Sequence, residues 1–236
     1  MNLQSLKSII RHRLRVLSDA FSGHDFCRRD SAPKASAAIG CHCLRLSHPF
    51  MPAQTLENKK HNLRQAAVRI NGAAVRPGQV FSFWRMVGNP NDATRFREGR
   101  SIHAGKAVID RGGGLCQASG IIHHASLLMQ LDVVERHNHS VDLYTEKTRF
   151  APLGTDATVF FGYKDLRVRN NTDAMLRFVL TVTDAALRLD VYSDKELRPC
   201  RLVTEVNVND SGVKDVAIYS PDGRCLCRSS YLPHKD

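Results

Sequence analysis

The sequence predicts an α+β fold in which N-terminal helices pack on a mostly antiparallel sheet. Segments in the first half of the chain have the apolar spacing of helices, and from Val133 onward short segments rich in β-branched and aromatic residues alternate with turn signals. The length of 236 residues, with 42% hydrophobic and 24% charged residues, suits one large soluble domain or one domain with extensions.

Residues 1–55 predict a basic amphipathic helix followed by a loosely structured extension. Apolar residues from Leu3 to Leu17 recur at helical spacing, and Lys7, Arg11 and Arg15 lie between them. Such an apolar stripe usually docks on the domain behind it, and an anionic membrane surface is the alternative partner. Residues 23–52 are rich in turn formers and lack a sustained period, so we expect a linker or loose packing there.

Residues 56–198 carry the elements of the main predicted domain. Helical spacing predicts helices over Leu56–Val68 and Leu115–Leu131, with a short buried strand around Val80–Trp84 between them. The strands predicted after the second helix cover residues 132–137, 140–146, 157–163, 166–171, 176–183 and 186–193. Residues 199–236 predict a C-terminal hairpin and tail.

Three consecutive glycines, Gly112, Gly113 and Gly114, stand two residues before Cys116 at the start of the second helix. Glycine allows positive φ and the close approach of another chain segment or a substrate, so these glycines are candidate binding residues. A thiol in the first turn of a helix meets the positive end of the dipole, which lowers its pKa and favours a nucleophile. The ordinary alternative is a cysteine that packs as a small hydrophobe. The Lys-Ser/Thr pair of a phosphate-binding P-loop does not follow the glycines.

His139 and Asp156 are the predicted partners of Cys116. The order cysteine on a helix, histidine on a strand and aspartate near a later strand is that of transglutaminase-like and papain-like enzymes. In that arrangement His139 takes the thiol proton and Asp156 orients the imidazole ring. Gln117 or the Cys116 N–H would stabilise an oxyanion.

Charge and cysteine content limit the partners. A net charge of +11 and a pI near 9.6 favour polyanions such as wall polymers or acidic lipid, yet no zinc-finger, helix-turn-helix or RRM pattern predicts specific nucleic-acid recognition. Seven cysteines are an odd number, so reduced thiols are expected. No apolar run suits a membrane span or a signal peptide, which predicts a cytoplasmic protein, with peripheral membrane association as the alternative.

Cysteine and histidine pairs near both ends of the chain raise the alternative of a shared zinc ion. They are Cys41-His42-Cys43 with His48, and Cys225-x-Cys227 with His234. Structural zinc sites prefer two to four residues between cysteines, so unrelated free thiols are expected and neither a metal nor a cofactor is predicted.

Five segments of the chain, in order, resemble the VanW-like family: LRQAAVRINGAAVRPGQVFSFWRMVG, GGGLCQASG, DVVERHNHSVDLY, GTDATVFFGYKDLRVRNNT and LRLDVYS. The resemblance runs from about Leu56 to Arg198 and implies an association with the bacterial cell envelope and with glycopeptide (vancomycin) resistance. The polar and thiol residues at family motif positions are Cys116, Gln117, His139, Ser140, Asp156, Asp165, Arg169 and Asn170. Four of these join the glycines as candidate binding residues, namely Gln117, Asp165, Arg169 and Asn170.

The chain departs from the family pattern at two places. His123 and His124 replace an aromatic and a small polar residue, and we expect them to form a polar pair on the helix surface, since His123 lies two turns from Cys116. The segment TEKTRFAPLGTDA is longer than the usual turn.

Two functions are compatible with these observations. The first is an enzyme in which Cys116, His139 and Asp156 carry out acyl transfer or amide hydrolysis on a cell-wall peptide or its precursor. The second is a noncatalytic module that associates with peptidoglycan or another wall polymer through its basic surface, with GGGLCQ as a structural turn.

Overall fold

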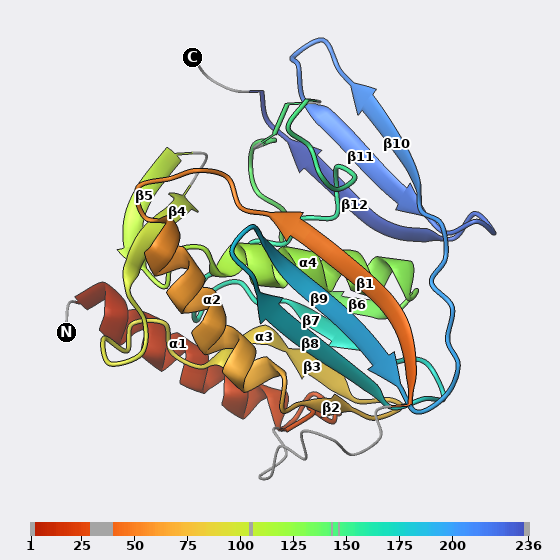
Figure 1. The fold of residues 1–236 in the computed structure, drawn as a ribbon, viewed down its shortest axis with the longest axis horizontal. Coiled ribbons are helices and arrows are strands. Elements are labelled where there is room, and N and C mark those ends of the chain that lie inside the picture. Colours follow the sequence, from red (N-terminus) through yellow and green to blue (C-terminus); the bar gives the residue numbers. More distant parts are fainter. Residues whose placement is uncertain (1–2, 29–39, 104–105, 143, 146, 234–236) are drawn as a thin grey trace.

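The computed structural model describes residues 3–28, 40–103, 106–142, 144–145 and 147–233, and within them the chain forms four helices and twelve strands (Figure 1). The helices are α1 (Leu3–Asp19), α2 (Leu56–Ile70), α3 (Phe83–Val87) and α4 (Leu115–Leu128). The strands are β1 (Cys41–Pro49), β2 (Ala74–Val75), β3 (Val80–Ser82), β4 (Glu98–His103), β5 (Lys106–Arg111), β6 (Asp132–Glu135), β7 (Arg167–Arg169), β8 (Leu176–Val182), β9 (Ala186–Ser193), β10 (Val203–Val208), β11 (Lys214–Tyr219) and β12 (Cys225–Tyr231).

The strands pair antiparallel in four small sheets. Their orders are β1-β9-β8-β2, β3-β7-β6, β10-β11-β12 and the hairpin β4-β5. Helices packed beside antiparallel sheets confirm the predicted α+β class.

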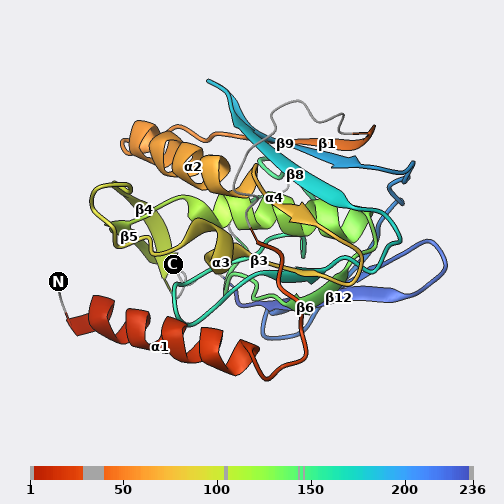
Figure 2. The same ribbon diagram turned by 90° about the horizontal axis from the view of Figure 1, so that it is seen from below.

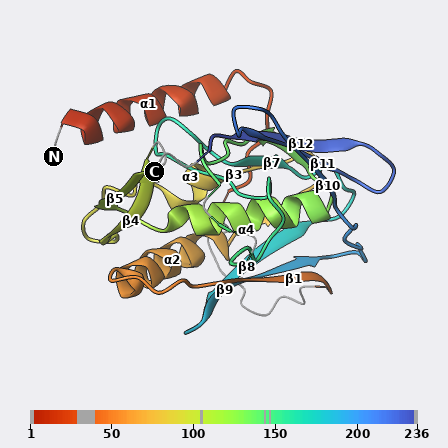
Figure 3. The same cartoon turned by 90° about the horizontal axis from the view of Figure 1, so that it is seen from above.

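Helix α4 lies in the middle of the molecule. Figures 2 and 3 show it between the sheet β1-β9-β8-β2 on one side and the strands β3, β7 and β6 on the other, with α2 beside it. Most of its residues are buried, including Ala118, Ile121, Ile122 and Ala125. A helix that is covered on all sides keeps its position rigidly, so the first turn of α4 is a firm support for the Cys116 side chain.

Strand β1 corrects one expectation. Residues 41–49 form an edge strand along β9, so the prediction of a loosely structured segment is wrong for them. Leu44, Leu46 and His48 face inward, while Arg45 and Ser47 are exposed. This alternation of period two is short and is flanked by turn formers, which hid it in the sequence. Residues 29–39 of the expected extension lie outside the described residues.

Other predicted strands also differ from the structure. Residues 140–146 and 157–163 contain no strand in their described part, where only the bridges Val141–Leu232 and Phe160–Lys164 occur, and residues 143 and 146 lie outside it. The strand predicted at Val80–Trp84 stops at Ser82, whose Oγ accepts a hydrogen bond from a first-turn N–H of α3. The C-terminal region is a three-stranded sheet rather than one hairpin, and the hairpin β4-β5 was not predicted.

Helix α1 is present as predicted, but it docks on the domain with its polar face and leaves its apolar stripe exposed. Its residues buried against the domain are Ser8 and Asp19, whereas Leu14 is 60% and Phe21, just beyond its end, is 90% exposed. The expectation that the apolar stripe docks on the domain is therefore wrong, because ion pairs such as Asp19–Arg167 (2.7 Å) hold the polar face instead. Over the residues that the structure describes, no helix combines the length and the apolar character that crossing a membrane requires.

Candidate active site

Cys116 lies in the first turn of α4, as the sequence predicts. The helix begins at Leu115, and Gly114 precedes it with φ of 96°. Cys116 is half-buried as a residue, and its Sγ lies 3.7 Å from Thr158 Oγ1 and 3.8 Å from Val159 O. The thiol is therefore held in place by these two neighbours.

The glycines before Cys116 allow the chain to pack closely against itself. A Cβ on Gly113 would lie 2.2 Å from the carbonyl carbon of Gly99 in β4, and one on Gly114 would lie 2.4 Å from Lys59 Cγ in α2. Asn62 Nδ2 donates to Gly113 O at 3.0 Å. In this structure β4 and α2 are the segments that approach the glycines closely. Their contacts fix the position of the first turn of α4.

Replacing Gly113 with alanine is expected to destabilise the protein by about 1–3 kcal/mol, because the new methyl group meets backbone atoms that cannot turn aside. Urea unfolding followed by circular dichroism measures the change. Gly120→Ala in the same helix is the matched control, since the nearest atom to its new Cβ is 3.6 Å away. That control should be neutral or stabilising by up to about 1 kcal/mol. Equal stability of the two variants would contradict the packing role of Gly113.

His139 and Asp156 are brought together by hydrogen bonds. His139 Nδ1 lies 2.7 Å from Asp156 Oδ2, and the same oxygen accepts the His139 backbone N–H at 2.8 Å. The segment that carries Asp156 is held beside the His139 segment by the bond from Thr158 N to His137 O at 2.7 Å. Because Nδ1 is engaged by the carboxylate, Nε2 is the nitrogen left to hydrogen-bond Cys116.

The three groups form a line of alternating charges. Burial alone would raise the pKa of the Cys116 thiol, but its hydrogen bond and charge interaction with His139 outweigh burial and lower the pKa. Burial likewise opposes the charge on His139, yet the hydrogen bonds to Asp156 and Cys116 raise the pKa of the imidazole well above its usual range. The pKa of Asp156 is lowered, despite burial, by His139 and Arg136. The arrangement favours a thiolate, an imidazolium and a carboxylate.

Two further residues complete the surroundings of Asp156. Arg136, whose side chain is only 5% exposed, donates from Nη2 to Asp156 Oδ1 at 2.9 Å. The buried hydroxyl of Tyr231 in β12 donates to the same oxygen. Neither residue was predicted from the sequence. Arg136 belongs to the quoted segment DVVERHNHSVDLY and its motif position was a signal for it, whereas Tyr231 lies beyond residue 198 and had no signal.

Lys59 is a third residue that the sequence analysis missed. Its side-chain methylene groups pack against Gly114, and its ammonium lies over the Phe50 ring at 5.7 Å from the ring centre. Burial and Arg100 lower the pKa of Lys59 to about 8, while the charge on Cys116 acts in the opposite direction. A cation therefore stands near the thiol on the side of α2.

Gln117 makes its hydrogen bonds to β1. Its Nε2 donates to His48 O and Pro49 O, each at 3.1 Å, so the amide anchors β1 to α4. Both of these bonds engage the amide nitrogen, so a role of this side chain at an oxyanion stays a prediction. The Cys116 N–H remains the candidate donor, because N–H groups in the first turn of a helix have no intrahelical acceptor.

Three other predicted binding residues make hydrogen bonds within the fold, and their binding role stays a prediction. Asp165 is buried and accepts hydrogen bonds from Ser82 Oγ (2.6 Å) and Trp84 N (3.1 Å). Asn170 Nδ2 donates to two backbone carbonyls, and Arg169 Nη2 lies 3.2 Å from His24 Nδ1. Their hydrogen bonds tie strands and turns together and do not involve Cys116, His139 or Asp156. The exposed Ser140 accepts the Leu232 N–H through its carbonyl.

His123 and His124 are buried rather than on the helix surface. They are 0% and 8% exposed, because the sheet β1-β9-β8-β2 and the loops beside it cover this part of α4. His123 Nδ1 donates to Thr155 O at 2.9 Å, and His124 Nδ1 lies 3.4 Å from His48 Nε2. The prediction of an exposed polar pair is wrong, since periodicity alone did not show that α4 is covered on both sides.

The terminal cysteine pairs lie in different sheets, with Cys41 and Cys43 in β1 and Cys225 and Cys227 in β12. His42 hydrogen-bonds Asp190 at 2.9 Å. No three His, Cys, Asp or Glu side chains come together to hold a metal ion in the part of the chain that the structure covers. His234, part of the zinc alternative, lies outside the described residues.

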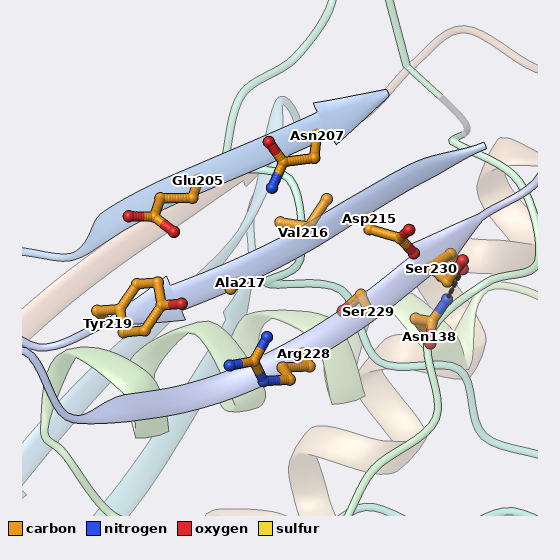
Figure 4. Close-up of a pocket in the computed structure, with 10 residues that line it drawn as sticks. All are labelled: Asn138, Glu205, Asn207, Asp215, Val216, Ala217, Tyr219, Arg228, Ser229 and Ser230. Atoms are coloured by element: carbon orange, nitrogen blue, oxygen red, sulfur yellow. Dashed lines mark hydrogen bonds between the residues drawn. The ribbon is translucent and has the colours of Figure 1, made fainter. Parts of the chain in front are cut away.

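An open polar groove of about 530 Å³ lies on the face of the sheet β10-β11-β12 (Figure 4). Glu205, Asn207, Tyr219 and Arg228 point into it from the three strands. Asn138, the neighbour of His139, stands at one end and donates to Ser230 O at 2.7 Å. The groove thus borders the His139 segment, and Cys116 is not among its lining residues.

Comparisons with known proteins place the chain in a family. The family model described as VanW like protein matches residues 58–192. The chain belongs to the VanW-like family. Cys116, His139 and Asp156 all lie inside the matched region of this VanW-like domain.

Two curated relatives match the chain. It is 36% identical over 140 residues to the vancomycin B-type resistance protein VanW of Enterococcus faecalis, covering 59% of this chain and 51% of that protein. It is 27% identical over 160 residues to the uncharacterized protein YoaR of Bacillus subtilis, covering 64% of this chain and 51% of that protein. The chain thus spans about half the length of these relatives. No solved structure matches the chain, and a papain-like arrangement stays a prediction.

Proposed function

We propose that the VanW-like domain is a cysteine-dependent enzyme that transfers or hydrolyses an acyl group of a cell-wall peptide or its precursor. The observation that carries this proposal is the chain of interactions from Cys116 through His139 to Asp156, in which the thiol of a half-buried cysteine interacts with an imidazole whose Nδ1 lies 2.7 Å from a carboxylate oxygen. Such a chain of interactions is the arrangement of an activated nucleophile, its acid–base partner and the group that orients that partner.

The reaction proceeds in two balanced steps. The Cys116 thiolate attacks the carbonyl carbon of an amide, the C–N bond breaks, and the imidazolium of His139 gives its proton to the departing amine. The neutral imidazole then takes a proton from water or a second amine, which attacks the thioester and releases the thiolate. Asp156 holds the ring orientation through both steps, and the Cys116 N–H supports the oxyanion.

The substrate class rests on the relatives and on charge. The relative from Enterococcus faecalis carries the name of a vancomycin resistance protein, which supports a substrate among cell-wall peptides. The net charge of +11 suits work next to anionic wall polymers. Lys59, close to the thiol, offers a cation to an acidic group of the substrate.

The noncatalytic alternative is a wall-binding module, and the open groove on the sheet β10-β11-β12 is the observation that favours it (Figure 4). Its lining of amide, hydroxyl, carboxylate and guanidinium groups suits a polar polymer. In that case Cys116 has only a packing role. Retention of the protein on wall material would then not depend on Cys116.

The deciding experiment incubates the protein with peptides released from peptidoglycan and follows both peptides and protein by mass spectrometry. We expect an acyl adduct on Cys116 and changed peptides with the wild type and with Cys200→Ser, and neither with Cys116→Ser. Thermal melting verifies that both variants fold. Identical peptides from all three proteins, without an adduct, would reject the enzyme and favour the wall-binding module.

A further inference from the structure

Helix α1 presents an uncovered apolar stripe. The exposed large apolar residues on it and just beyond its end are Leu3 (67%), Leu6 (41%), Ile10 (49%), Leu14 (60%), Leu17 (62%) and Phe21 (90%). Their spacing of three or four residues places them on one face of the helix. Figures 2 and 3 show α1 at the outer edge of the molecule, which leaves that face open to a partner.

The orientation of α1 is fixed by specific contacts on its opposite face. Arg15 pairs with Glu135 and donates to Tyr163 O at 3.0 Å. Asp19 accepts from Arg167 Nη1 at 2.7 Å and from Arg85 Nη1 at 3.3 Å. Since these polar groups are held by the domain, turning the apolar stripe inward would break partly buried ion pairs and leave the buried Asp19 without its partners, which is unfavourable.

Close packing adds to this orientation. The His12 ring lies on Phe161 with 4.5 Å between ring centres. A Cβ on Gly162 would lie only 2.4 Å from Ser8 O, so the loop approaches the helix backbone as closely as only glycine allows. The domain is therefore shaped to receive the polar face of α1.

Cations flank the apolar stripe. Lys7 and Arg13 are exposed on opposite sides of it, and Arg11, on the side of Lys7, is exposed while its guanidinium lies over the Tyr163 ring at 4.5 Å from the ring centre. No acidic residue lies in α1 before Asp19, which faces the domain. An apolar stripe bordered by cations is the pattern of a helix that lies in the interface of an anionic bilayer.

We propose that α1 binds the surface of a membrane that contains anionic lipid, with the apolar stripe among the acyl chains and the flanking cations at the headgroups. The polar face stays on the domain, so the helix holds the VanW-like domain against the membrane. A second copy of this chain is the less favourable occupant, because two such stripes would bring their cationic borders together.

Vesicle flotation tests the proposal with vesicles of phosphatidylcholine alone and with vesicles that contain phosphatidylglycerol. Wild-type protein should float with the anionic vesicles and not with the neutral ones, and added salt should weaken binding. The double variant Leu6→Ser/Leu14→Ser should bind about tenfold more weakly or worse. Lys7→Gln/Arg13→Gln should lose the preference for anionic lipid.

Val206→Ser in β10 is the matched control, because Val206 is also exposed (45%) but lies on another element. It should bind as the wild type does, and thermal melting verifies that every variant is folded. Unchanged binding of Leu6→Ser/Leu14→Ser would overturn the proposal. Absence of wild-type binding would overturn it too, and a dimer in gel filtration that this double variant abolishes would identify a second copy as the occupant.

Discussion

Replacing His139 with alanine is expected to slow the alkylation of Cys116 by iodoacetamide about tenfold at pH 6.5, because the variant loses the imidazolium that stabilises the thiolate. An ordinary thiol with a pKa of about 8.5 is only about 1% ionised at that pH. A paired thiol, with its lowered pKa, is ionised to a larger extent at that pH, but the lower pKa also makes the thiolate less nucleophilic, which reduces the gain. Wild-type labelling should persist toward low pH, whereas labelling of His139→Ala should fall steeply below pH of about 8.5.

Peptide mass spectrometry gives each cysteine its own labelling rate, so the protein contains its own reference thiol. Burial raises the pKa of Cys200, and its labelling at pH 6.5 should be slow in every variant. His137→Ala is the matched substitution, since His137 is two residues away and its Nε2 interacts with Glu135 at 3.2 Å instead of the thiol. Equal slowing by His137→Ala and His139→Ala, or an ordinary pKa of Cys116 in the wild type, would contradict the pairing.

The site illustrates what a single sequence reveals. The first-turn position of Cys116 follows from the glycines and the helical period, and the chain order suggested His139 and Asp156 as partners. Tyr231 had no signal, because β12 reaches the carboxylate of Asp156 only through tertiary packing of a separate sheet. The hydrogen bonds of Gln117 to the carbonyls of His48 and Pro49 had no signal either, because they depend on where β1 lies.

The same limit applies to the fold. Long periodic segments such as α2, β8 and β9 were predicted near their observed bounds, because their burial pattern repeats over several turns or residues. Residues 41–49 were missed because only a few alternating positions mark them. For α1 the period was right and the docking face wrong, since a sequence shows that a stripe exists but not which partner covers it.

Three buried histidines are expected to make the stability of the protein depend on pH. His48, His123 and His124 are 6%, 0% and 8% exposed. Burial lowers the pKa of His48 and of His123 to about 3 each and that of His124 to about 4. Among the described residues His123 Nε2 has no hydrogen-bond partner, and a proton there would be a buried unpaired charge.

Acidification is therefore expected to destabilise the protein. In the unfolded chain these rings take up protons below a pH of about 6.5, while in the folded protein they stay neutral until far lower pH. The unfolded state thus binds more protons at these three rings, and together they should lower the free energy of unfolding by about 4 kcal/mol from pH 7.5 to 5.5, with about 1.4 kcal/mol from each ring. His12, whose pKa is also lowered by burial, adds to this fall, and His139, whose pKa is raised, opposes it. Urea unfolding at the two pH values measures this fall.

The pH range of 7.5 to 5.5 and the choice of variant separate the contribution of the histidines to the pH dependence of stability from that of the carboxylates. Asp156, Asp142 and Asp190 have lowered pKa values, so their contributions are present above the unfolded pKa of about 3.9 and are lost only at lower pH. Asp165, whose pKa is raised by burial, acts in the opposite direction in every variant alike.

The double variant His48→Gln/His124→Gln removes two of the three buried rings, and the fall in its unfolding free energy from pH 7.5 to 5.5 should be smaller than that of the wild type by about 2.8 kcal/mol, the share of two rings. The substitutions also change the free energy of unfolding at each single pH. The difference between its values at the two pH values, however, changes only because the two histidine rings no longer titrate. An unchanged difference would mean that the folded protein accepts protons on His48 and His124, and it would refute a neutral histidine cluster between β1 and α4.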